Sequence, residues 1–493
     1  MQDQTTSTSS PQPDAPIGLA ALEARLRQDL HWLDLPARPW VPAREVDGEP
    51  VLEVAVIGGG MAGLAASAML RQLGIRARVF DQAPEGFEGP WATTARMETL
   101  RSPKQLTGPA LGLPALTFRA WFEAQFGLDA WEALDKIPRL QWMDYLRWYR
   151  KVMQIDIANA HRVEQLLPRA DGVVEVRMTS PQGPVRVLAR RVVLATGRDG
   201  LGGAYVPEFA AALPRRFWAH SSDAMDYGML RGRRVGVIGA GASAMDSAAT
   251  ALEAGATSVE LLVRRADLPR INKSKGSGNP GLTHGHYDLP DAWKWRLRNY
   301  INREQVPPPR GSTLRVSRHP NARFHLGSPI QQVQVDGDVL RVATASAQFE
   351  LDFLIFSTGF RVDFGLRPEF GVIAPHIRLW GDRFQPPAGQ EDEELRTSPD
   401  LGPVFEFQEK APGACPGLSR IHCFCYPAAL SHGTISGDIP AISDGARRLG
   451  QGIASLLYRE DVELHFAALQ AYAEPELYGD EWTPATAAAR QDR

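Results

Sequence analysis

A short run of apolar, β-branched residues over 54–57 leads directly into three consecutive glycines and then into a stretch that is almost wholly apolar. The run Val54–Ile57 predicts a buried strand because it is short and bounded by glycine, and the alanine-rich stretch over 64–70 predicts a buried helix. Residues 76–80 alternate between polar and apolar side chains and predict a second strand ending at Asp81. The pattern therefore indicates a strand, a glycine turn, a helix and a second strand.

The glycines of this turn have the G-x-G-x-x-G spacing of a dinucleotide-binding motif. Gly58 lets the chain turn tightly, Gly60 lets a pyrophosphate approach the backbone, and Gly63 lets the helix pack against the strand. Asp81 follows about 20 residues later, where a carboxylate can accept hydrogen bonds from the ribose hydroxyls of an adenine dinucleotide. A glycine turn in another kind of α/β unit is the alternative, but the strand, helix and acid together favour the nucleotide site.

A second unit of the same kind begins at residues 234–238, which predict a strand leading into a G-x-G turn. This turn contains Gly239, Gly241 and Ser243, and Ala244 replaces the third glycine. The next predicted strand ends in Arg264 and Arg265 rather than in an acid. Guanidinium groups bind a 2′-phosphate that a carboxylate would repel, so this site is predicted to prefer NADPH over NADH. The alternative is that the two arginines are simply solvated.

Two further buried strands end in a threonine and a glycine, as a chain does where its backbone passes close to a bound dinucleotide. Residues 163–189 predict a three-stranded meander, and the strand 192–194 that follows ends in Ala195-Thr196-Gly197. Short strands around Asp336-Gly337 are similarly followed by the strand 353–356, which ends in Ser357-Thr358-Gly359. The repeat implies two related nucleotide-binding units.

The other regular segments are predicted from helical or alternating periodicity. Leucines at helical spacing from Leu19 to Leu33 predict an amphipathic helix, interpreted as a packing extension. Residues 267–315 resemble neither unit and are predicted to form a lid over the cleft between the domains. Residues 86–118 are rich in glycine, proline and aromatics, and long irregular segments of this kind are usually functional. Further helices are predicted over 121–131, 142–153, 293–300 and 442–458, and a strand over 421–425.

Histidine and cysteine pairs offer little chemistry of their own. His284 and His286 alternate within the insertion, but no third or fourth ligand lies nearby, so no metal site is predicted. Cys423 and Cys425 have CxC rather than CxxC spacing and are predicted to pack in the core. With Cys415 they make an odd and low count that excludes a disulfide framework and fits a reducing compartment.

The composition narrows the classes of partner. The chain has 493 residues, enough for two or more domains, with 44% hydrophobic and 23% charged residues and a formal net charge of -3. Because basic and acidic residues are interspersed, neither a nucleic-acid partner nor a membrane-binding segment is predicted. Met1 to Ile17 is polar and lacks an apolar core, so it predicts a disordered tail rather than a signal peptide. We therefore expect a cytoplasmic protein.

With two dinucleotide turns and two Thr-Gly strand ends, residues 52 to 460 resemble the class B flavin-dependent monooxygenases. That group comprises flavin-containing monooxygenases, Baeyer–Villiger monooxygenases and amine N-hydroxylases. The resemblance implies FAD at the first turn and NADPH at the second, and it places Trp91 of a Gly-Pro-Trp element near the flavin ring. The residues implied to bind the two cofactors are Gly58, Gly60, Gly63, Asp81, Trp91, Thr196, Gly197, Gly239, Gly241, Ser243, Ala244, Arg264, Arg265, Thr358, Gly359 and Asp438.

Within that group the motifs resemble the ornithine and lysine N-hydroxylases most. The stretch Thr99–Pro103 is similar to their Leu-Arg-x-Pro, and the C-terminal Ser431-His432-Gly433 is similar to theirs, but the lysine that those enzymes place upstream of Leu-Arg is absent. Of the fingerprint of the other two subfamilies only His220 is present. The resemblance makes Arg101, Asn272 and His432 the candidates for orienting oxygen, NADP or substrate.

Together these patterns predict an α/β protein with two dinucleotide-binding Rossmann-like domains, in which an NADPH domain interrupts the FAD domain. The FAD domain is predicted over 51–205 and 345–460, and the NADPH domain over 206–344. A tail and helical extension precede them over 1–50, and a C-terminal tail follows over 461–493. The predicted function is oxygen insertion from O2 into a small nucleophilic substrate through a peroxyflavin, with N-hydroxylation of an amine or amino acid favoured. The alternatives are Baeyer–Villiger or sulfide oxygenation, an NADPH-dependent flavin reductase, and a non-catalytic redox-sensing flavoprotein; the chain is a possible homo-oligomer.

Overall fold

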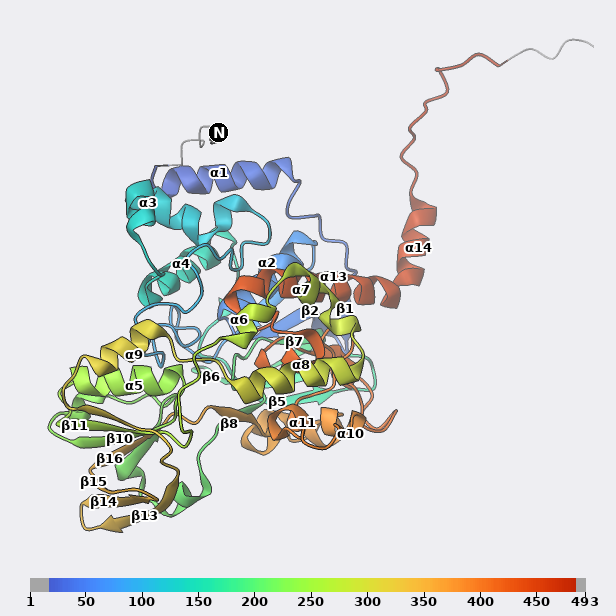
Figure 1. Cartoon of the computed structure of the whole chain (residues 1–493). Helices are drawn as coiled ribbons and strands as arrows, with labels where there is room; N and C mark the ends of the chain where they lie inside the picture. The colour runs from blue at the N-terminus through green and yellow to red at the C-terminus, as the bar shows by residue number, and fades with distance from the viewer. Residues whose placement is uncertain (1–16, 485–493) are drawn as a thin grey trace, which may run out of the picture.

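The apolar run at 54–57 forms the buried end of β2 (Glu49–Ile57), the central strand of an eight-stranded sheet. In the computed structural model (Figure 1), which describes residues 17–484, β3 and β7 pair with β2 in parallel register on its two sides. The sheet order is β4-β3-β2-β7-β6-β5, with β1 beside β2 and β18 beside β7. These strands are β1 (Arg44–Val46), β3 (Ala77–Phe80), β4 (Ile157–Ala158), β5 (Arg162–Pro168), β6 (Val174–Ser180), β7 (Gly183–Leu194) and β18 (Ile421–Cys423).

The predicted meander and the buried strand after it share one continuous strand, β7, of 12 residues. Its first part pairs antiparallel with β6, and its last part pairs parallel with β2 and β18. No glycine or proline interrupts the chain after Pro184, so the strand continues while its partners change. The separate strands expected over 163–189 and 192–194 are corrected accordingly.

The second sheet repeats the parallel part of the first. Its five strands are all parallel in the order β12-β11-β10-β16-β9, with the glycine-turn strand β10 at the centre. A separate antiparallel meander lies beside it, and a two-stranded pair joins the domains. The strands are β9 (Trp218–His220), β10 (Arg234–Ile238), β11 (Ser258–Leu262), β12 (Ala322–His325), β13 (Ile330–Asp336), β14 (Val339–Thr344), β15 (Gln348–Leu351) and β16 (Phe353–Phe356), with the joining pair β8 (Gly202–Ala204) and β17 (Phe360–Val362).

The domain boundary expected at residue 345 differs from the sheet topology. β16 pairs with β10 and β9, so the strand that ends in Thr358-Gly359 belongs to the second sheet. The chain returns to the first domain only through β17, which pairs antiparallel with β8. The reason is that each Rossmann-like unit needs its own flanking parallel strand beside the glycine-turn strand, as β7 is in the first unit and β16 in the second.

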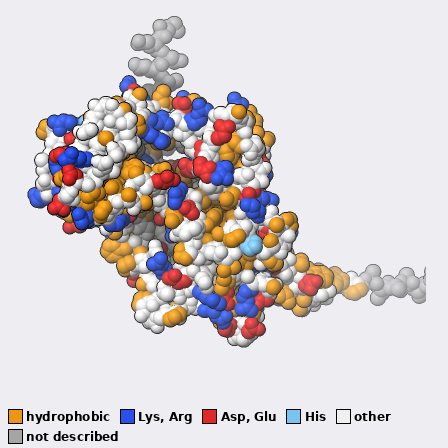
Figure 2. Space-filling view, turned by 90° about the horizontal axis from the view of Figure 1, so that it is seen from below, with side chains coloured by type: hydrophobic (Ala, Val, Ile, Leu, Met, Phe, Trp, Pro, Cys, Tyr) orange, Lys and Arg blue, Asp and Glu red, His pale blue; other side chains and the backbone are white. Residues whose placement is uncertain are grey.

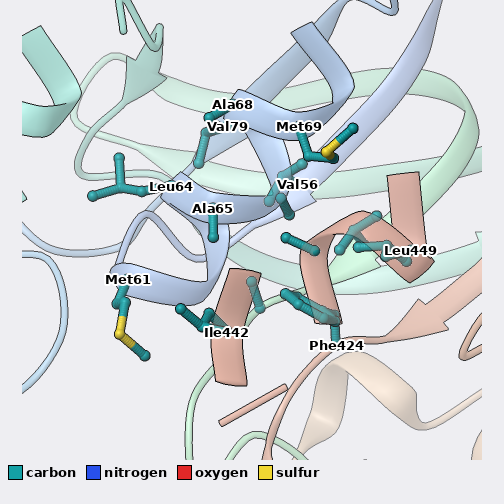
Figure 3. Close-up of a cluster of buried hydrophobic side chains, with 14 of the residues drawn as sticks. Val56, Met61, Leu64, Ala65, Ala68, Met69, Val79, Phe424, Ile442 and Leu449 are labelled. Carbon is teal, nitrogen blue, oxygen red and sulfur yellow. The ribbon is translucent and has the colours of Figure 1, made fainter. Parts of the chain in front are cut away.

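Helices cover the sheets, and α2 and α5 follow the two glycine turns. In the first domain α13 packs on α2, with Ile442 of α13 near Met61 and Ala65 of α2 and Leu449 on the side of Met69 (Figure 3). The helices are α1 (Leu19–Trp32), α2 (Met61–Gln72), α3 (Phe118–Ala133), α4 (Arg139–Val152), α5 (Ala242–Glu253), α6 (Lys273–Ser277), α7 (Pro280–Gly285), α8 (Asp291–Glu304), α9 (Arg310–Ser317), α10 (Trp380–Arg383), α11 (Glu393–Thr397), α12 (Ala429–His432), α13 (Ile442–Glu460) and α14 (Val462–Ala471).

The insertion 267–315 contacts both domains. Trp295 and Asn299 of α8 each donate a hydrogen bond to the carbonyl oxygen of Gln390, at 2.8 and 3.2 Å. Asn302 donates to Asp392, while α9 packs on α5 of the second domain. In this structure the insertion bridges the two domains, because the polar groups of α8 find partners in the first domain, and its role as a lid stays a prediction.

The two ends of the described chain behave differently. The leucine pattern predicted α1 correctly, with Leu22 and Leu26 buried. The expected tail 461–493 instead contains α14, none of whose residues is buried, and apolar side chains gather along this protruding arm (Figures 1 and 2). The expected disordered tail lies outside the described residues except for Ile17. No helix within residues 17–484 is long and apolar enough to cross a membrane.

Candidate cofactor clefts and reaction site

The first glycine turn leaves room on one side only. Gly58 has φ +104°, and a Cβ added to it would lie 2.5 Å from the carbonyl oxygen of Ala195. A Cβ at Gly63 would lie 1.8 Å from the carbonyl oxygen of Gly58, so only glycine lets α2 pack this close to the strand. A Cβ at Gly60 would meet nothing closer than Gly89 Cα at 3.7 Å. This open side, at the N-terminus of α2, is where a pyrophosphate can approach.

Asp81 is buried at the end of β3 and is hydrogen-bonded to the turn. Its two carboxylate oxygens accept from the amides of Gly59 at 2.6 Å and Ala83 at 2.7 Å. Burial raises the pKa of Asp81, and the two amides lower it in part. Each carboxylate oxygen keeps a further lone pair, so the group can still accept a ribose hydroxyl.

The irregular segment after Asp81 lies over the glycine turn. A Cβ at Gly89 would lie 3.8 Å from Gly60 Cα, so the Gly-Pro-Trp element passes close to the turn. Trp91 is half-buried, with its ring centroid 6.5 Å from that of Trp142 in an edge-on arrangement. Sequence reasoning missed Glu88, a buried acid that accepts from Arg150 and Asn159 beside Asp81. Its position seven residues after Asp81 carries no motif that could have identified it.

The strand ends also fit a dinucleotide. Within the described residues the buried hydroxyl of Thr196 has no hydrogen-bond partner, and Gly197 has φ +85°. Asp438 lies at the entry to α13, and burial raises the pKa of its carboxyl group. An unpaired hydroxyl beside an open glycine turn is the arrangement expected where a cofactor supplies the missing partner. These residues therefore fit an adenine dinucleotide at the first turn.

The second turn repeats this geometry. A Cβ at Gly239 would lie 2.5 Å from the carbonyl oxygen of Ser357, whereas one at Gly241 would meet no described atom within 4 Å. The buried hydroxyl of Ser357 has no hydrogen-bond partner among residues 17–484. Thr358 instead donates to the carbonyl oxygen of Tyr205, and Gly359 has φ +86°. The open side of this turn fits a second dinucleotide.

The side chains around the second turn are compatible with a dinucleotide bound there. Ser243 is exposed at the start of α5, and the buried Ala244 occupies the position of the third glycine. Arg265 donates to the carbonyl oxygen of Arg303 at 2.9 Å, whereas Arg264 is exposed just beyond the end of β11. Arg264 is therefore the better placed of the two arginines to meet a 2′-phosphate.

Arg101 lies where the two domains meet. Burial lowers the pKa of its guanidinium, the Asp246 carboxylate on α5 raises it, and Arg198 lowers it further. Arg198 follows the Ala-Thr-Gly strand end, and its guanidinium lies 4.3 Å from the ring centroid of Tyr426. In the described part of the chain neither guanidinium donates a hydrogen bond or forms an ion pair. Sequence reasoning missed Arg198 and Asp246, although their positions beside Gly197 and on the helix after the second turn are sequence signals.

His432 is a core residue, which corrects its expected place at the reaction centre. The ring is fully buried between Phe405 and Tyr287, with centroids 3.8 and 4.7 Å away. Its Nε2 donates to the carbonyl oxygen of Gly402 at 2.9 Å, and Arg448 approaches Nδ1 at 3.4 Å. Burial lowers the pKa of His432 to about 3, so the ring is neutral.

Two other predicted positions have local structural partners. Asn272 caps α6, its side-chain oxygen accepting from the amide of Lys275 at 2.9 Å. His220 bonds the hydroxyl of Ser222 through Nδ1, and its buried Nε2 has no partner among the described side chains. Cys423 and Cys425 are buried, as expected, with their sulfur atoms 3.5 Å apart. No group of three or more His, Cys, Asp or Glu side chains within residues 17–484 could hold a metal ion.

Two family models match parts of the chain. Residues 55–199 match the model described as FAD-NAD(P)-binding, which contains the first glycine turn, Asp81 and Thr196. Residues 130–305 match the model described as L-lysine 6-monooxygenase/L-ornithine 5-monooxygenase. Among solved structures, the ornithine hydroxylase of Pseudomonas aeruginosa has a TM-score of 0.64 at 16% identity, covering 82% of this chain and 98% of that one. The ornithine N-hydroxylase of Kutzneria sp. 744 has a TM-score of 0.62 at 18% identity, covering 82% and 99%.

A curated relative covers almost the whole chain. The FAD-dependent urate hydroxylase of Xanthomonas campestris pv. campestris is 39% identical over 478 residues, which are 96% of this chain and 100% of the relative. This similarity extends through both glycine turns, the junction at Arg101 and the C-terminal helices. The chain therefore belongs to the family of flavin-dependent monooxygenases that includes this hydroxylase, and FAD and a nicotinamide dinucleotide are its cofactors.

Proposed function

We propose that the protein hydroxylates urate, or a closely related anionic purine, with FAD, NADPH and O2. The observation that carries the proposal is the 39% identity to a urate hydroxylase along the full length of both chains. The identity to the ornithine hydroxylases is 16 to 18%, which supports a common fold rather than a common substrate.

The charges at the domain junction suit such a substrate. Urate is a flat monoanion at neutral pH, and a guanidinium can pair with its oxygens in the plane or stack on its face. The guanidinium groups of Arg101 and Arg198 donate no hydrogen bond to the described residues, and the positive charge of Arg198 lowers the pKa of Arg101. An anion between them would relieve this repulsion, whereas an ammonium group would add to it.

The chain's own residues have three tasks in this reaction. The bound flavin supplies the oxygen-transfer chemistry. Gly60 and the N-terminus of α2 bind its pyrophosphate, Asp81 binds its ribose, and Arg264 is placed for the 2′-phosphate of NADPH. Arg101 and Arg198 orient the anionic substrate, and the Gly-Pro-Trp element with Trp91 limits the access of water, which would otherwise divert reduced flavin to hydrogen peroxide.

The test is turnover of the purified FAD-loaded protein with NADPH and urate in air. We expect urate to disappear in a one-to-one ratio with NADPH, with a product one oxygen atom heavier by mass spectrometry, and NADPH to be used in preference to NADH. Arg101→Gln should raise KM for urate about tenfold, while Arg27→Gln, at an exposed position on α1, should not. NADPH oxidation that yields only hydrogen peroxide, with urate unchanged, would refute the proposal.

Amine N-hydroxylation is the second candidate, favoured by the family match over residues 130–305 and by the Thr99–Pro103 stretch. An amine must lose its proton before it can attack oxygen, so its hydroxylation should accelerate with rising pH. Turnover of L-ornithine, L-lysine or cadaverine to a hydroxylamine, with no reaction on urate, would select this candidate instead.

A further inference from the structure

A pocket of about 430 Å³ lies away from both glycine turns, between the start of α8, α10 and α12. None of the residues assigned above to FAD, the nicotinamide nucleotide or the substrate lines it. Its walls combine aromatic and apolar side chains with four charged groups. The lining residues are Tyr287, Leu289, Pro290, Asp291, Lys294, Trp380, Arg383, Asp400, Leu401 and Ser431.

Three of the four charged groups in this pocket are already paired with one another. Arg383 bonds both carboxylate oxygens of Asp291, at 2.7 and 3.0 Å, and one oxygen of Asp400 at 2.8 Å. Asp400 also forms an ion pair with Arg378, at 2.6 Å. The indole Nε1 of Trp380 donates to the hydroxyl of Ser431 at 3.0 Å, which fixes the inner wall. These side chains form a rigid frame with little free charge.

Lys294 is the exception. The residue as a whole is 6% exposed, and its ammonium forms no hydrogen bond and no ion pair with residues 17–484. The ammonium lies 4.9 Å from the ring centroid of Tyr287 and 6.0 Å from that of Trp380. Desolvation lowers its pKa, and Asp291 raises it in part. A positive charge that lines a pocket and forms no ion pair with the described residues can be balanced by an anionic ligand.

We propose that this pocket binds a small organic monoanion, whose carboxylate pairs with Lys294 and whose apolar part lies against Leu289, Pro290 and the edge of Tyr287. The cavity volume is in the range of pockets for small organic molecules. A monoanion is favoured over a dianion such as phosphate because only one cation is free and the carboxylates of Asp291 and Asp400 would repel a second negative charge. The assignment is independent of the urate proposal, because the two sites share no residue.

The test uses the full-length FAD-loaded protein and benzoate as the probe, with neutral benzamide as its isostere. In isothermal titration and ligand-observed NMR we expect benzoate to bind one-to-one and at least tenfold more tightly than benzamide. Inorganic phosphate should not displace it. Lys294→Met should lower benzoate affinity at least tenfold, whereas Lys151→Met, at an exposed position on α4, should leave it unchanged.

The position of the bound benzoate is also checked in the wild-type protein, so this check does not depend on the folding of a variant. Brief acetylation followed by peptide mass spectrometry should label Lys294 in the free protein, and benzoate should protect this lysine but not Lys151. Equal affinity for benzoate and benzamide, absence of protection at Lys294, or loss of benzoate binding in Arg101→Gln rather than in Lys294→Met would each overturn the proposal. The last result would place the anion at the domain junction, whereas failure of urate turnover would leave this pocket unaffected.

Discussion

His432 shows how burial determines the protonation of a residue that a motif alone would place in catalysis. Its pKa is lowered to about 3, against an ordinary value of 6.5. Between these values the unfolded chain binds the proton and the folded chain does not. The stabilisation is therefore complete above about pH 6.5 and is lost as the pH falls toward 3, by up to about 1.4 kcal/mol per pH unit.

His432→Phe tests this assignment, because a phenyl ring can keep the stack between Phe405 and Tyr287 but cannot be protonated. Between about pH 6 and pH 5, the free energy of unfolding of the wild type should fall as the pH falls, by up to about 1.4 kcal/mol per pH unit. We expect this contribution to the slope to be absent in the variant. Urea titrations of both proteins at several pH values measure the slope. If wild type and variant have the same slope, His432 is not a buried neutral group.

At the same scale, residues whose role is local were predictable and residues whose role depends on distant partners were not. Gly58, Gly60 and Gly63 were identified because the turn that needs them lies within a few residues. His432 was misplaced because the groups that enclose it, Tyr287 and Phe405, lie far along the chain. Arg198 lies next to Gly197, which is a sequence signal, but its proximity to Arg101 could not be predicted because Arg101 comes from a distant loop.

At the scale of elements, different glycines of the turn between β2 and α2 serve folding and cofactor binding. A Cβ at Gly63 would lie 1.8 Å from a backbone oxygen, whereas a Cβ at Gly60 has 3.7 Å of clearance. Gly63→Ala should therefore destabilise the FAD-free protein by about 3 kcal/mol through overpacking. Gly60→Ala should change that stability by less than about 1 kcal/mol but weaken FAD binding about tenfold, because it fills the space for the pyrophosphate.

Urea unfolding of the FAD-free proteins and fluorescence titration with FAD measure the two effects separately. Gly311→Ala, where a Cβ would meet no described atom within 4 Å, is the matched control and should change neither quantity much. A Gly60→Ala protein with normal FAD affinity would show that the cofactor does not approach this face of the turn.

Elements with a strong local period were predicted well, including both glycine-turn strands, the meanders and α13. Errors arose where pairing between distant strands decides the outcome. β7 is one strand because it changes partners rather than direction, and β16 belongs to the second sheet because β10 needs a parallel neighbour. The bridge formed by α8 depends on carbonyl and carboxylate groups about 90 residues further on, which periodicity cannot indicate.

At the scale of the whole molecule, two units of the same topology must present their cofactors to each other. Reciprocal contacts hold them together. Arg96 of the first domain donates to the carbonyl oxygen of Met225 at 3.4 Å and lies over the ring of Tyr227. Arg315 of α9 donates to the carbonyl oxygen of Arg96 at 3.2 Å, and its guanidinium is 3.5 Å from Glu98. Both contacts involve the irregular segment that also carries Trp91 and Arg101.

Arg315 is the better of these two arginines for testing whether the contacts between the domains align the cofactors. It is 9% exposed and is also paired with the exposed Glu253 at 2.6 Å, so Arg315→Ala removes charge-assisted hydrogen bonds and should cost about 2 kcal/mol of stability. Because the segment of Trp91 and Arg101 loses its contact with α9, we also expect flavin reduction at saturating NADPH to slow about tenfold. FAD affinity should stay unchanged, since Arg315 is remote from the first glycine turn.

Arg318→Ala, at an exposed position one turn further along, is the matched control. Stopped-flow reduction of the FAD-loaded proteins without oxygen separates a role in stability from a role in aligning the cofactors. Lower stability with a normal reduction rate would mean that the contacts of Arg315 support folding alone.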